Sequence, residues 1–386
     1  MKQNPLNVLT LKNSNRALIL ECIRRSPISR ADISRRVGLS KSSVTMLTAE
    51  MIEEGLLREA GLAERTPELG RTSILMDLVP DYAFAVGVTL HRRHIGVCAT
   101  DLKAQPLFRI RKPLTEFFRA EEVVAWIGDT VAAALEERGL PFERCVGVGV
   151  SSPGPLDYRA GVILEPPGLP LFRRYPIVAR LQERFACPVH LENNAVALAQ
   201  LDFYRRADAQ GSELFVVVAD GIGSALLNDG RVFRGAQGFA GELGHISIDP
   251  TGRRCACGNR GCLEQYATLS NLRERFSLDS YETVADAAAN GNPQALEVLD
   301  FLAGRLGMAL VNCVNLYDLD RVVMYGEYAY RGELLNNRLQ RYICRHSLTQ
   351  QVHPVTVVPS ALTMEDRDLA SAVSALNDFF ANNWNR

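Results

Sequence analysis

Apolar residues in the first 80 positions recur with the spacing of short helices that each turn one face to a core. Ser29 and Ser40 precede two of these runs, where a serine oxygen can accept hydrogen bonds from the first free backbone N–H groups of a helix. The expected helices span 15–25, 30–37 and 41–54, and the expected strands span 56–59 and 73–77. Three helices followed by a hairpin is the order of a winged helix-turn-helix.

From Tyr82 onward the pattern changes to apolar strands that alternate with amphipathic helices. The strands are expected over 83–90, 94–100, 146–150, 214–219 and 321–325, and the helices over 120–138, 176–185, 194–204, 293–316 and 366–383. Such alternation is typical of an α/β architecture.

The composition is that of a globular protein long enough for two or three domains, with 386 residues and a net charge of −1. Residues 1–77 hold 12 Lys and Arg against 9 Asp and Glu, whereas residues 78–386 hold 31 against 35. This excess favours an anionic partner for the N-terminal part. The sequence shows no signal-peptide pattern and no apolar run of about 18 residues, so we expect a cytoplasmic protein without a membrane partner.

One imidazole and three thiols lie within eighteen residues, at His245, Cys255, Cys257 and Cys262. Thiolate and imidazole are the ligands of tetrahedral structural zinc. The alternative is three buried free cysteines beside a hydrogen-bonded histidine, but such a cluster in an intracellular chain more often binds metal. We therefore expect one structural zinc ion per chain, with no coordination position left open for catalysis.

The metal-ligand segment and its neighbours also resemble a known family. Residues 241–245 read Gly-Glu-Leu-Gly-His, residues 255–264 read Cys-Ala-Cys-Gly-Asn-Arg-Gly-Cys-Leu-Glu, and glycine-rich runs stand at 221–224 and 230–236. Together these motifs resemble the ROK family of sugar kinases and sugar-responsive repressors, from about residue 81 to the C-terminus. The resemblance implies a two-lobed actin-like, ribonuclease-H-like ATPase fold with a cleft between the lobes.

The same resemblance suggests three domains. They are a winged helix-turn-helix DNA-binding domain over 1–80, a first ROK lobe over 81–192 that is completed by a C-terminal helix over about 370–386, and a second ROK lobe with the zinc loop over 193–369.

The third expected helix has residues suited to reading DNA. Small polar and cationic side chains at its N-terminal end can contact phosphates and base edges in the major groove, and arginines in the hairpin can contact phosphate or the minor groove. The candidate DNA-binding residues are Ser40, Lys41, Ser42, Ser43, Thr45, Arg65 and Arg71. The alternative is a helical hairpin that mediates protein contacts. Family repressors carry such a DNA-binding unit, and a palindromic double-stranded operator implies a homodimer or homotetramer.

A sugar kinase of this family opens its first lobe with Asp-x-Gly-Gly-Thr, whose aspartate and glycines serve the phosphate. This chain has Thr89 at the aspartate position and His91 and Arg92 at the two glycines. The family's catalytic aspartate ends a Glu-Asn-Asp triplet, where this chain has Asn194. An amide cannot accept the proton of a sugar hydroxyl. The sequence therefore predicts that the protein is not an enzyme.

The residues that hold sugar in this family are better preserved. Carboxylate, amide and imidazole groups can bridge neighbouring sugar hydroxyls and discriminate among them. The candidate effector-binding residues are Ser152, Gly154, Asn193, Asn194, Glu242, His245 and Glu264. Glu242 and Glu264 could instead serve only to hold the metal loop. The run from Pro166 to Pro170 departs from the family pattern, which points to an unusual ligand.

We therefore expect a DNA-binding transcriptional regulator, a repressor of carbohydrate-metabolism genes, whose sugar or sugar-derived effector binds in the cleft. Such control requires that the effector bind two conformers with different affinity. Two alternatives stay open: a sugar kinase with an appended DNA-binding domain, and a repressor controlled by a partner protein instead of a sugar.

Overall fold

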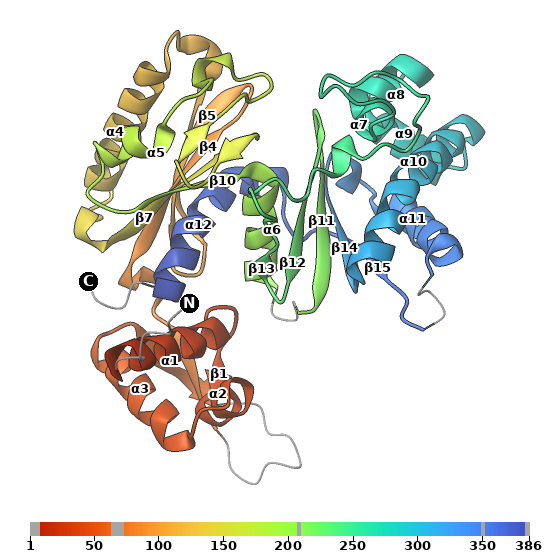
Figure 1. Cartoon of the computed structure of the whole chain (residues 1–386). Helices are drawn as coiled ribbons and strands as arrows, with labels where there is room; N and C mark the ends of the chain where they lie inside the picture. Colours follow the sequence, from red (N-terminus) through yellow and green to blue (C-terminus); the bar gives the residue numbers. More distant parts are fainter. Residues whose placement is uncertain (1–7, 63–72, 207–209, 349–351, 383–386) are drawn as a thin grey trace. The chain divides into compact units, whose positions relative to one another are not determined.

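Figure 1 shows the computed structural model, which describes residues 8–62, 73–206, 210–348 and 352–382. The chain divides into two compact units. The first unit comprises 1–197, 204–207 and 367–386, and the second comprises 198–203 and 208–366. The chain therefore passes between the units four times, after residues 197, 203, 207 and 366, and the first two of these passages lie within one helix that spans residues 194–205.

Three helices and a small antiparallel sheet form the N-terminal module of the first unit, residues 8–78. The elements are α1 (Val8–Ile23), β1 (Ile28–Ser29), α2 (Arg30–Val37), α3 (Lys41–Glu53), β2 (Leu57–Leu62) and β3 (Ile74–Leu78). Ile19, Ile33, Leu47 and Met76 are buried in its core. The predicted helices and hairpin are confirmed, but α1 begins earlier than expected, and the two-residue β1 adds a third strand in the order β1-β3-β2.

Two predicted serine caps begin α2 and α3. The Ser29 hydroxyl accepts from the backbone N–H of Asp32, and the Ser40 hydroxyl accepts from that of Ser43, each over 3.1 Å. Gly38 ends α2 with a φ of 70°, in the left-handed region that favours glycine. The turn between α2 and α3 is therefore fixed at both ends, which sets the direction of α3.

A five-stranded mixed sheet forms the first lobe. In sheet order its strands are β10 (Val189–Asn193), β7 (Cys145–Ser152), β4 (Phe84–Leu90), β5 (His94–Asp101) and β6 (Pro106–Pro113). Strands β10, β7 and β4 run parallel, whereas β4, β5 and β6 are joined as antiparallel neighbours. Because parallel strands end at the same edge, residues that follow β4, β7 and β10 lie close together.

Helices cover this sheet on both faces (Figure 1). They are α4 (Ala120–Glu137) and α5 (Ile177–Gln182), together with α12 (Arg367–Asn382), which returns to the first lobe as the resemblance implies. Val86 and Ile127 belong to the core under α4. A Cβ on Gly149 would lie 1.9 Å from the carbonyl oxygen of Ser371, so only glycine lets α12 approach β7 this closely. The short strands β8 (Leu156–Asp157) and β9 (Val162–Ile163) form a separate hairpin.

The second unit is built on another five-stranded sheet. Its strands, in sheet order, are β13 (Arg231–Val232), β12 (Ile222–Asn228), β11 (Ser212–Val218), β14 (Arg321–Gly326) and β15 (Thr356–Pro359). Its helices are α7 (Glu264–Ala267), α8 (Leu269–Phe276), α9 (Tyr281–Ala289), α10 (Pro293–Tyr317) and α11 (Glu333–His346), and α6 (Asn194–Arg205) is shared between the two units. Among the described residues no helix is long and apolar enough to cross a membrane.

Candidate functional site

The outer face of α3 carries the predicted DNA-reading residues. Lys41, Ser42 and Thr45 are exposed on it, whereas Ser43 is half-buried. The Ser40 oxygen caps the helix and also lies 2.9 Å from the hydroxyl of Ser42 and 2.8 Å from that of Ser43. Ser40 therefore serves α3 itself, while Lys41, Ser42 and Thr45 offer polar groups to a partner.

Sequence reasoning missed Met46, whose side chain is 55% exposed on the same face of α3. An apolar group at this position can contact the methyl group of a thymine. The sequence does indicate this exposure, because Met46 does not share the helical spacing of the apolar residues Val44, Leu47 and Met51. Two predicted DNA contacts, Arg65 and Arg71, lie outside the described residues.

Buried polar contacts hold α3 in place within the module. Arg16 of α1 is 6% exposed, and its Nη1 donates to Oε1 of Glu54 over 2.7 Å, directly after the end of α3. Its Nη2 also contacts Oε2 of the same carboxylate. From α2, Nε of Arg30 donates to the buried Thr48 hydroxyl over 2.9 Å. The helix is therefore attached to both of its neighbours by charged groups that lie away from its exposed face.

Four candidate effector residues belong to one edge of the first-lobe sheet or follow directly after it. Asn193 stands opposite Ser152 in the β10–β7 pairing, so the two strands end side by side. Gly154 follows, with a cis peptide bond to the next proline. Asn194 begins α6, and its Oδ1 is buried without a hydrogen-bond partner. A buried acceptor left open at the carboxyl ends of parallel strands is available to a ligand.

The side chains at the expected phosphate loop contact other groups of the first unit. Thr89 is 1% exposed, and its hydroxyl donates to the carbonyl oxygen of Asp368 over 3.4 Å. Nε2 of His91 lies 2.9 Å from Nη1 of Arg367. Nε of Arg92 donates to the carbonyl oxygen of Pro167 over 3.0 Å. His91 and Arg92, at the positions where the resemblance places two glycines, thus each contact another group of the first unit.

The four predicted metal ligands come together in the second unit. Their ligand atoms all lie within 4.8 Å of one another. The sulfur atoms of Cys257 and Cys262 are 3.6 Å apart, and Sγ of Cys255 lies 3.7 Å from Nδ1 of His245. A tetrahedral zinc ion with bonds of about 2.0–2.3 Å places its ligand atoms about 3.5–3.8 Å apart. This histidine and three-cysteine cluster can therefore bind a metal ion.

The loop geometry that forms the cluster depends on backbone contacts and one glycine. The backbone N–H of Cys255 donates to the carbonyl oxygen of Asn259 over 2.9 Å, which closes the loop between the ligands. Gly261 has a φ of 67°, and a Cβ there would lie 1.7 Å from the carbonyl oxygen of Asp249. Sequence reasoning missed Gln265, whose Nε2 donates to Sγ of Cys255 over 3.6 Å. Such a donor stabilises a metal-bound thiolate.

The candidate carboxylates of the second unit border this cluster. Oε1 of Glu264 lies 3.6 Å from Nδ1 of His245 and 3.2 Å from Sγ of Cys255. Removal from water raises the pKa of Glu242, Glu264 raises it further, and His245 opposes the rise. Because Nδ1 of His245 faces the thiols, its Nε2 points to the other side of the ring. The metal loop thus groups Glu242, His245 and Glu264 within one unit.

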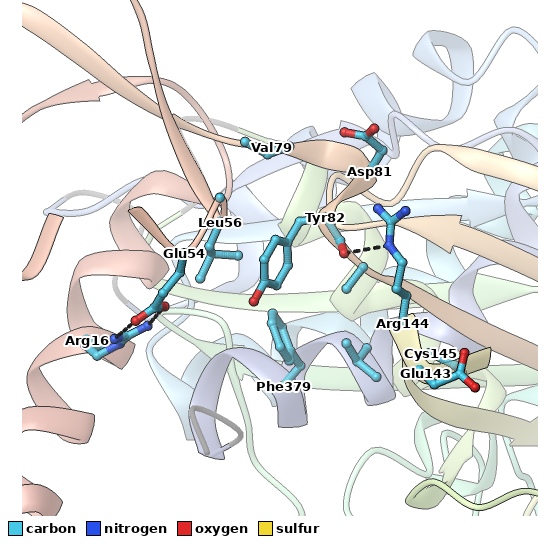
Figure 2. Close-up of a pocket in the computed structure, with 13 residues that line it drawn as sticks. Arg16, Glu54, Leu56, Val79, Asp81, Tyr82, Glu143, Arg144, Cys145 and Phe379 are labelled. Carbon is cyan, nitrogen blue, oxygen red and sulfur yellow. Dashed lines mark hydrogen bonds and ion pairs between the residues drawn. The ribbon is translucent and has the colours of Figure 1, made fainter. Parts of the chain in front are cut away.

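A cavity of about 590 Å³ lies within the first unit, where the N-terminal module meets the first lobe. Figure 2 shows the ion pair of Arg16 and Glu54 on one side of this junction cavity. On the other side Arg144 donates from Nε to the carbonyl oxygen of Tyr82 over 3.0 Å. Phe379 of α12 also lines it. No local sequence pattern indicates this cavity, because its walls come from segments far apart along the chain.

A helix-turn-helix module joined to a two-lobed fold of this topology defines a class of DNA-binding regulators built on a sugar-kinase scaffold. Residues 85–375 match the model of the ROK family, and residues 16–61 match that of the IclR helix-turn-helix domain. The chain belongs to the ROK family.

Relatives extend this similarity over nearly the whole chain. The xylose repressor of Caldicellulosiruptor bescii is 26% identical over 376 residues, which cover 92% of this chain and 94% of that protein. The N-acetylglucosamine repressor of Escherichia coli O157:H7 is 29% identical over 387 residues, which cover 96% of this chain and 93% of that protein. A solved structure, of a ROK family transcriptional regulator that is a homolog of the E. coli MLC protein, has a TM-score of 0.77 at 24% identity and covers 96% of this chain and 98% of that one.

Three predictions from the sequence are thereby confirmed. They are the ROK family, the fold class of a winged helix-turn-helix followed by a two-lobed ROK fold, and the class of function, a DNA-binding transcriptional regulator.

Proposed function

We propose that this protein represses carbohydrate-metabolism genes, reads its operator with α3, and is controlled by a sugar or sugar-derived effector. The exposed polar face of α3, which includes Lys41, Ser42 and Thr45, carries the proposal. Two relatives named as repressors for xylose and for N-acetylglucosamine support a monosaccharide as the effector class. Arg65 and Arg71 remain proposed DNA contacts of the hairpin.

The proposed effector-binding residues fall into two groups. Ser152, Gly154, Asn193 and Asn194 would contribute from the first lobe, and Glu242, His245 and Glu264 from the second. The open acceptor of Asn194 supports this role, because a sugar hydroxyl can donate to an amide oxygen. Carboxylates beside an imidazole support the second group, since each can bridge two hydroxyls and thereby select among sugars.

We propose that the protein does not phosphorylate its ligand. The support is chemical: Thr89 and Asn194 offer no carboxylate where the family's kinases have aspartates. The contacts of His91 and Arg92 occupy the space of the phosphate loop. The alternative, a sugar kinase with an appended DNA-binding domain, requires ATP turnover despite these changes.

We further propose that the metal is zinc, at one ion per chain, with a structural role. His245, Cys255, Cys257 and Cys262 would supply four ligands, which leaves no position for a reacting water. Bound zinc would hold the segment of Glu242 to that of Glu264, so the metal would order both proposed sugar contacts. Burial raises the pKa of Cys262 to about 12 in the metal-free chain, and coordination to zinc would deprotonate this thiol.

The assembly follows from the proposed operator. A palindromic site needs two modules, so we propose a homodimer or homotetramer. We propose that residues 1–80, 81–192 and 193–369 form three functional domains. The first two of these domains belong to one compact unit. Cytoplasmic localisation stays a prediction.

Selection of DNA from a random-sequence library tests the proposal. The full chain should enrich one sequence and bind it at least about a thousandfold more tightly than unselected duplex, measured by fluorescence anisotropy at a stated salt concentration. A chain that lacks residues 1–80 should not bind the selected duplex. Failure to enrich any sequence, or unchanged affinity after the deletion, would overturn the proposed function.

A further inference from the structure

One charged residue of the N-terminal module is buried against the first lobe. Arg24, directly after α1, is only 7% exposed. Its Nη1 donates to Oδ1 of Asn377 in α12 over 2.9 Å. Its guanidinium carbon lies 4.9 Å from the centre of the Tyr204 ring in α6 and 5.9 Å from that of Phe380 in α12. Arg24 therefore contacts two helices of the first lobe at once, by a hydrogen bond and by cation–π stacking.

These two helices lie where the chain passes between the two compact units. Helix α6 is shared, with residues 198–203 assigned to the second unit and Tyr204 to the first. Helix α12 begins at Arg367, the first residue after the chain leaves the second unit. Three of the four passages of the chain between the units therefore lie within α6 or at the start of α12, the two helices that Arg24 touches. A displacement of either helix would change the position of a group that Arg24 binds.

The Tyr204 ring is firmly placed in the first lobe. Its hydroxyl donates to the carbonyl oxygen of Leu102, in the turn between β5 and β6. The backbone N–H of Leu102 in turn donates to the carbonyl oxygen of Pro80, between the module and the lobe, over 3.0 Å. Burial raises the pKa of the Tyr204 hydroxyl, so it stays protonated and keeps this bond at physiological pH. The aromatic partner of Arg24 is thus tied to the first lobe by its own hydroxyl.

Elsewhere, the N-terminal module and the first lobe are less closely packed against each other. The junction cavity of about 590 Å³ separates the end of α3 from β7 and α12 (Figure 2). A gap of this size leaves room for the module to change its angle without breaking a close-packed core. The module is thus attached to the first lobe through Arg24 and is less closely packed where the junction cavity lies.

We propose that Arg24 is the positioning residue that couples α6 and α12, where the chain passes between the units, to the DNA-binding module. This inference rests on the proposed function, since it concerns how the state of the ROK lobes reaches α3. Arg24 does not read DNA or hold the effector. Because coupling is reciprocal, DNA binding at α3 should alter α6 and α12 through the same residue.

Hydrogen exchange with DNA as the only ligand tests this proposal. The probe is the duplex selected by the wild-type chain, used at a concentration that saturates each variant, so that weaker binding cannot imitate lost coupling. In the wild type, binding should change amide exchange in α6 and in the first turns of α12 by about threefold or more. Arg24→Met keeps an unbranched apolar stem and removes the guanidinium. Glu21 then loses Arg24, whose Nη2 lies 3.1 Å from its Oε1, but retains Arg25, whose Nη2 lies 3.5 Å from the same atom.

Arg24→Met should abolish the exchange response in α6 and α12 while α3 is still protected by DNA. Arg138→Met is the matched control, because Arg138 stacks 5.3 Å from the centre of the Phe108 ring within the first lobe and should leave the response intact. Tyr204→Leu provides a second test if Arg24→Met does not fold. It removes the stacking ring and leaves the bond to Asn377, and it should reduce the response.

Each outcome decides the matter. A response in Arg24→Met equal to that of the wild type would overturn the coupling role. If Arg24→Met does not fold, an undiminished response in Tyr204→Leu would do so, as would a wild type in which saturating DNA leaves exchange in α6 and α12 unchanged. Failure to select any duplex would instead overturn the proposed function and is distinguished by the absence of protection in α3.

Discussion

Arg16 of α1 and Glu54 at the end of α3 form a two-pronged ion pair, in which Nη1 lies 2.7 Å from Oε1 and Nη2 contacts Oε2. The guanidinium is almost fully buried, whereas the carboxylate reaches the junction cavity. The pair therefore attaches the C-terminal end of α3, the proposed DNA-reading helix, to α1.

This pair should contribute measurably to the stability of the module. Glu54→Ala leaves a buried cation without its main partner, and we expect the free energy of unfolding to fall by about 1–2 kcal/mol in denaturant titrations. Glu53→Ala is the matched control, since Glu53 is an exposed neighbour. Equal effects of the two substitutions would show that the ion pair does not stabilise the module.

Lys41 should contribute affinity without sequence preference. Its exposed ammonium at the start of α3 can neutralise one phosphate, so Lys41→Ala should weaken binding to selected and unselected duplexes alike. The slope of log affinity against log salt should become shallower by about 1. Lys12→Ala is the control, because Lys12 pairs with Glu50 over 2.8 Å. An unchanged salt slope for Lys41→Ala would place Lys41 outside the DNA contact.

Zinc loss should disturb the second unit and spare the N-terminal module. Cys257→Ser replaces a thiolate by a poorly ligating hydroxyl, so the metal content of roughly one zinc per chain should fall toward zero and the melting temperature should drop. Cys344→Ser, a half-buried thiol in α11 outside the cluster, should keep its zinc. Metal analysis that finds a full equivalent in Cys257→Ser, or none in the wild type, would refute the zinc assignment.

The amino-acid pattern predicted helices and ligands that depend on nearby residues. Helices α2 and α3 were expected because their serine caps and apolar periods are local signals. The metal ligands were expected because His245 and the three cysteines share one short segment. Strand β6 was missed because prolines and three basic residues interrupt its apolar pattern. The contacts of Arg24 with Tyr204 and α12 were missed for a different reason: they join distant segments, and no local pattern marks them.

Restoring one carboxylate should not restore kinase chemistry. Asn194→Asp supplies a base, but Thr89 still replaces the first aspartate and Arg92 still binds the Pro167 carbonyl oxygen. We expect ATP-dependent turnover of hexoses far below about 1 per second in both the wild type and the variant. Turnover at ordinary enzyme rates in the wild type would favour the kinase alternative.

In the proposed mechanism the ROK domain senses a sugar without ATP and changes the DNA affinity of the N-terminal module. The most direct measurement is the affinity for the selected duplex, followed by anisotropy during titration with D-xylose, N-acetylglucosamine, other monosaccharides and their phosphates, in the absence of ATP. We predict that at least one of these compounds changes the affinity for DNA by about tenfold or more, which corresponds to a coupling free energy of about 1.4 kcal/mol. Affinity that stays constant across the whole panel would contradict the claim and favour control by a partner protein.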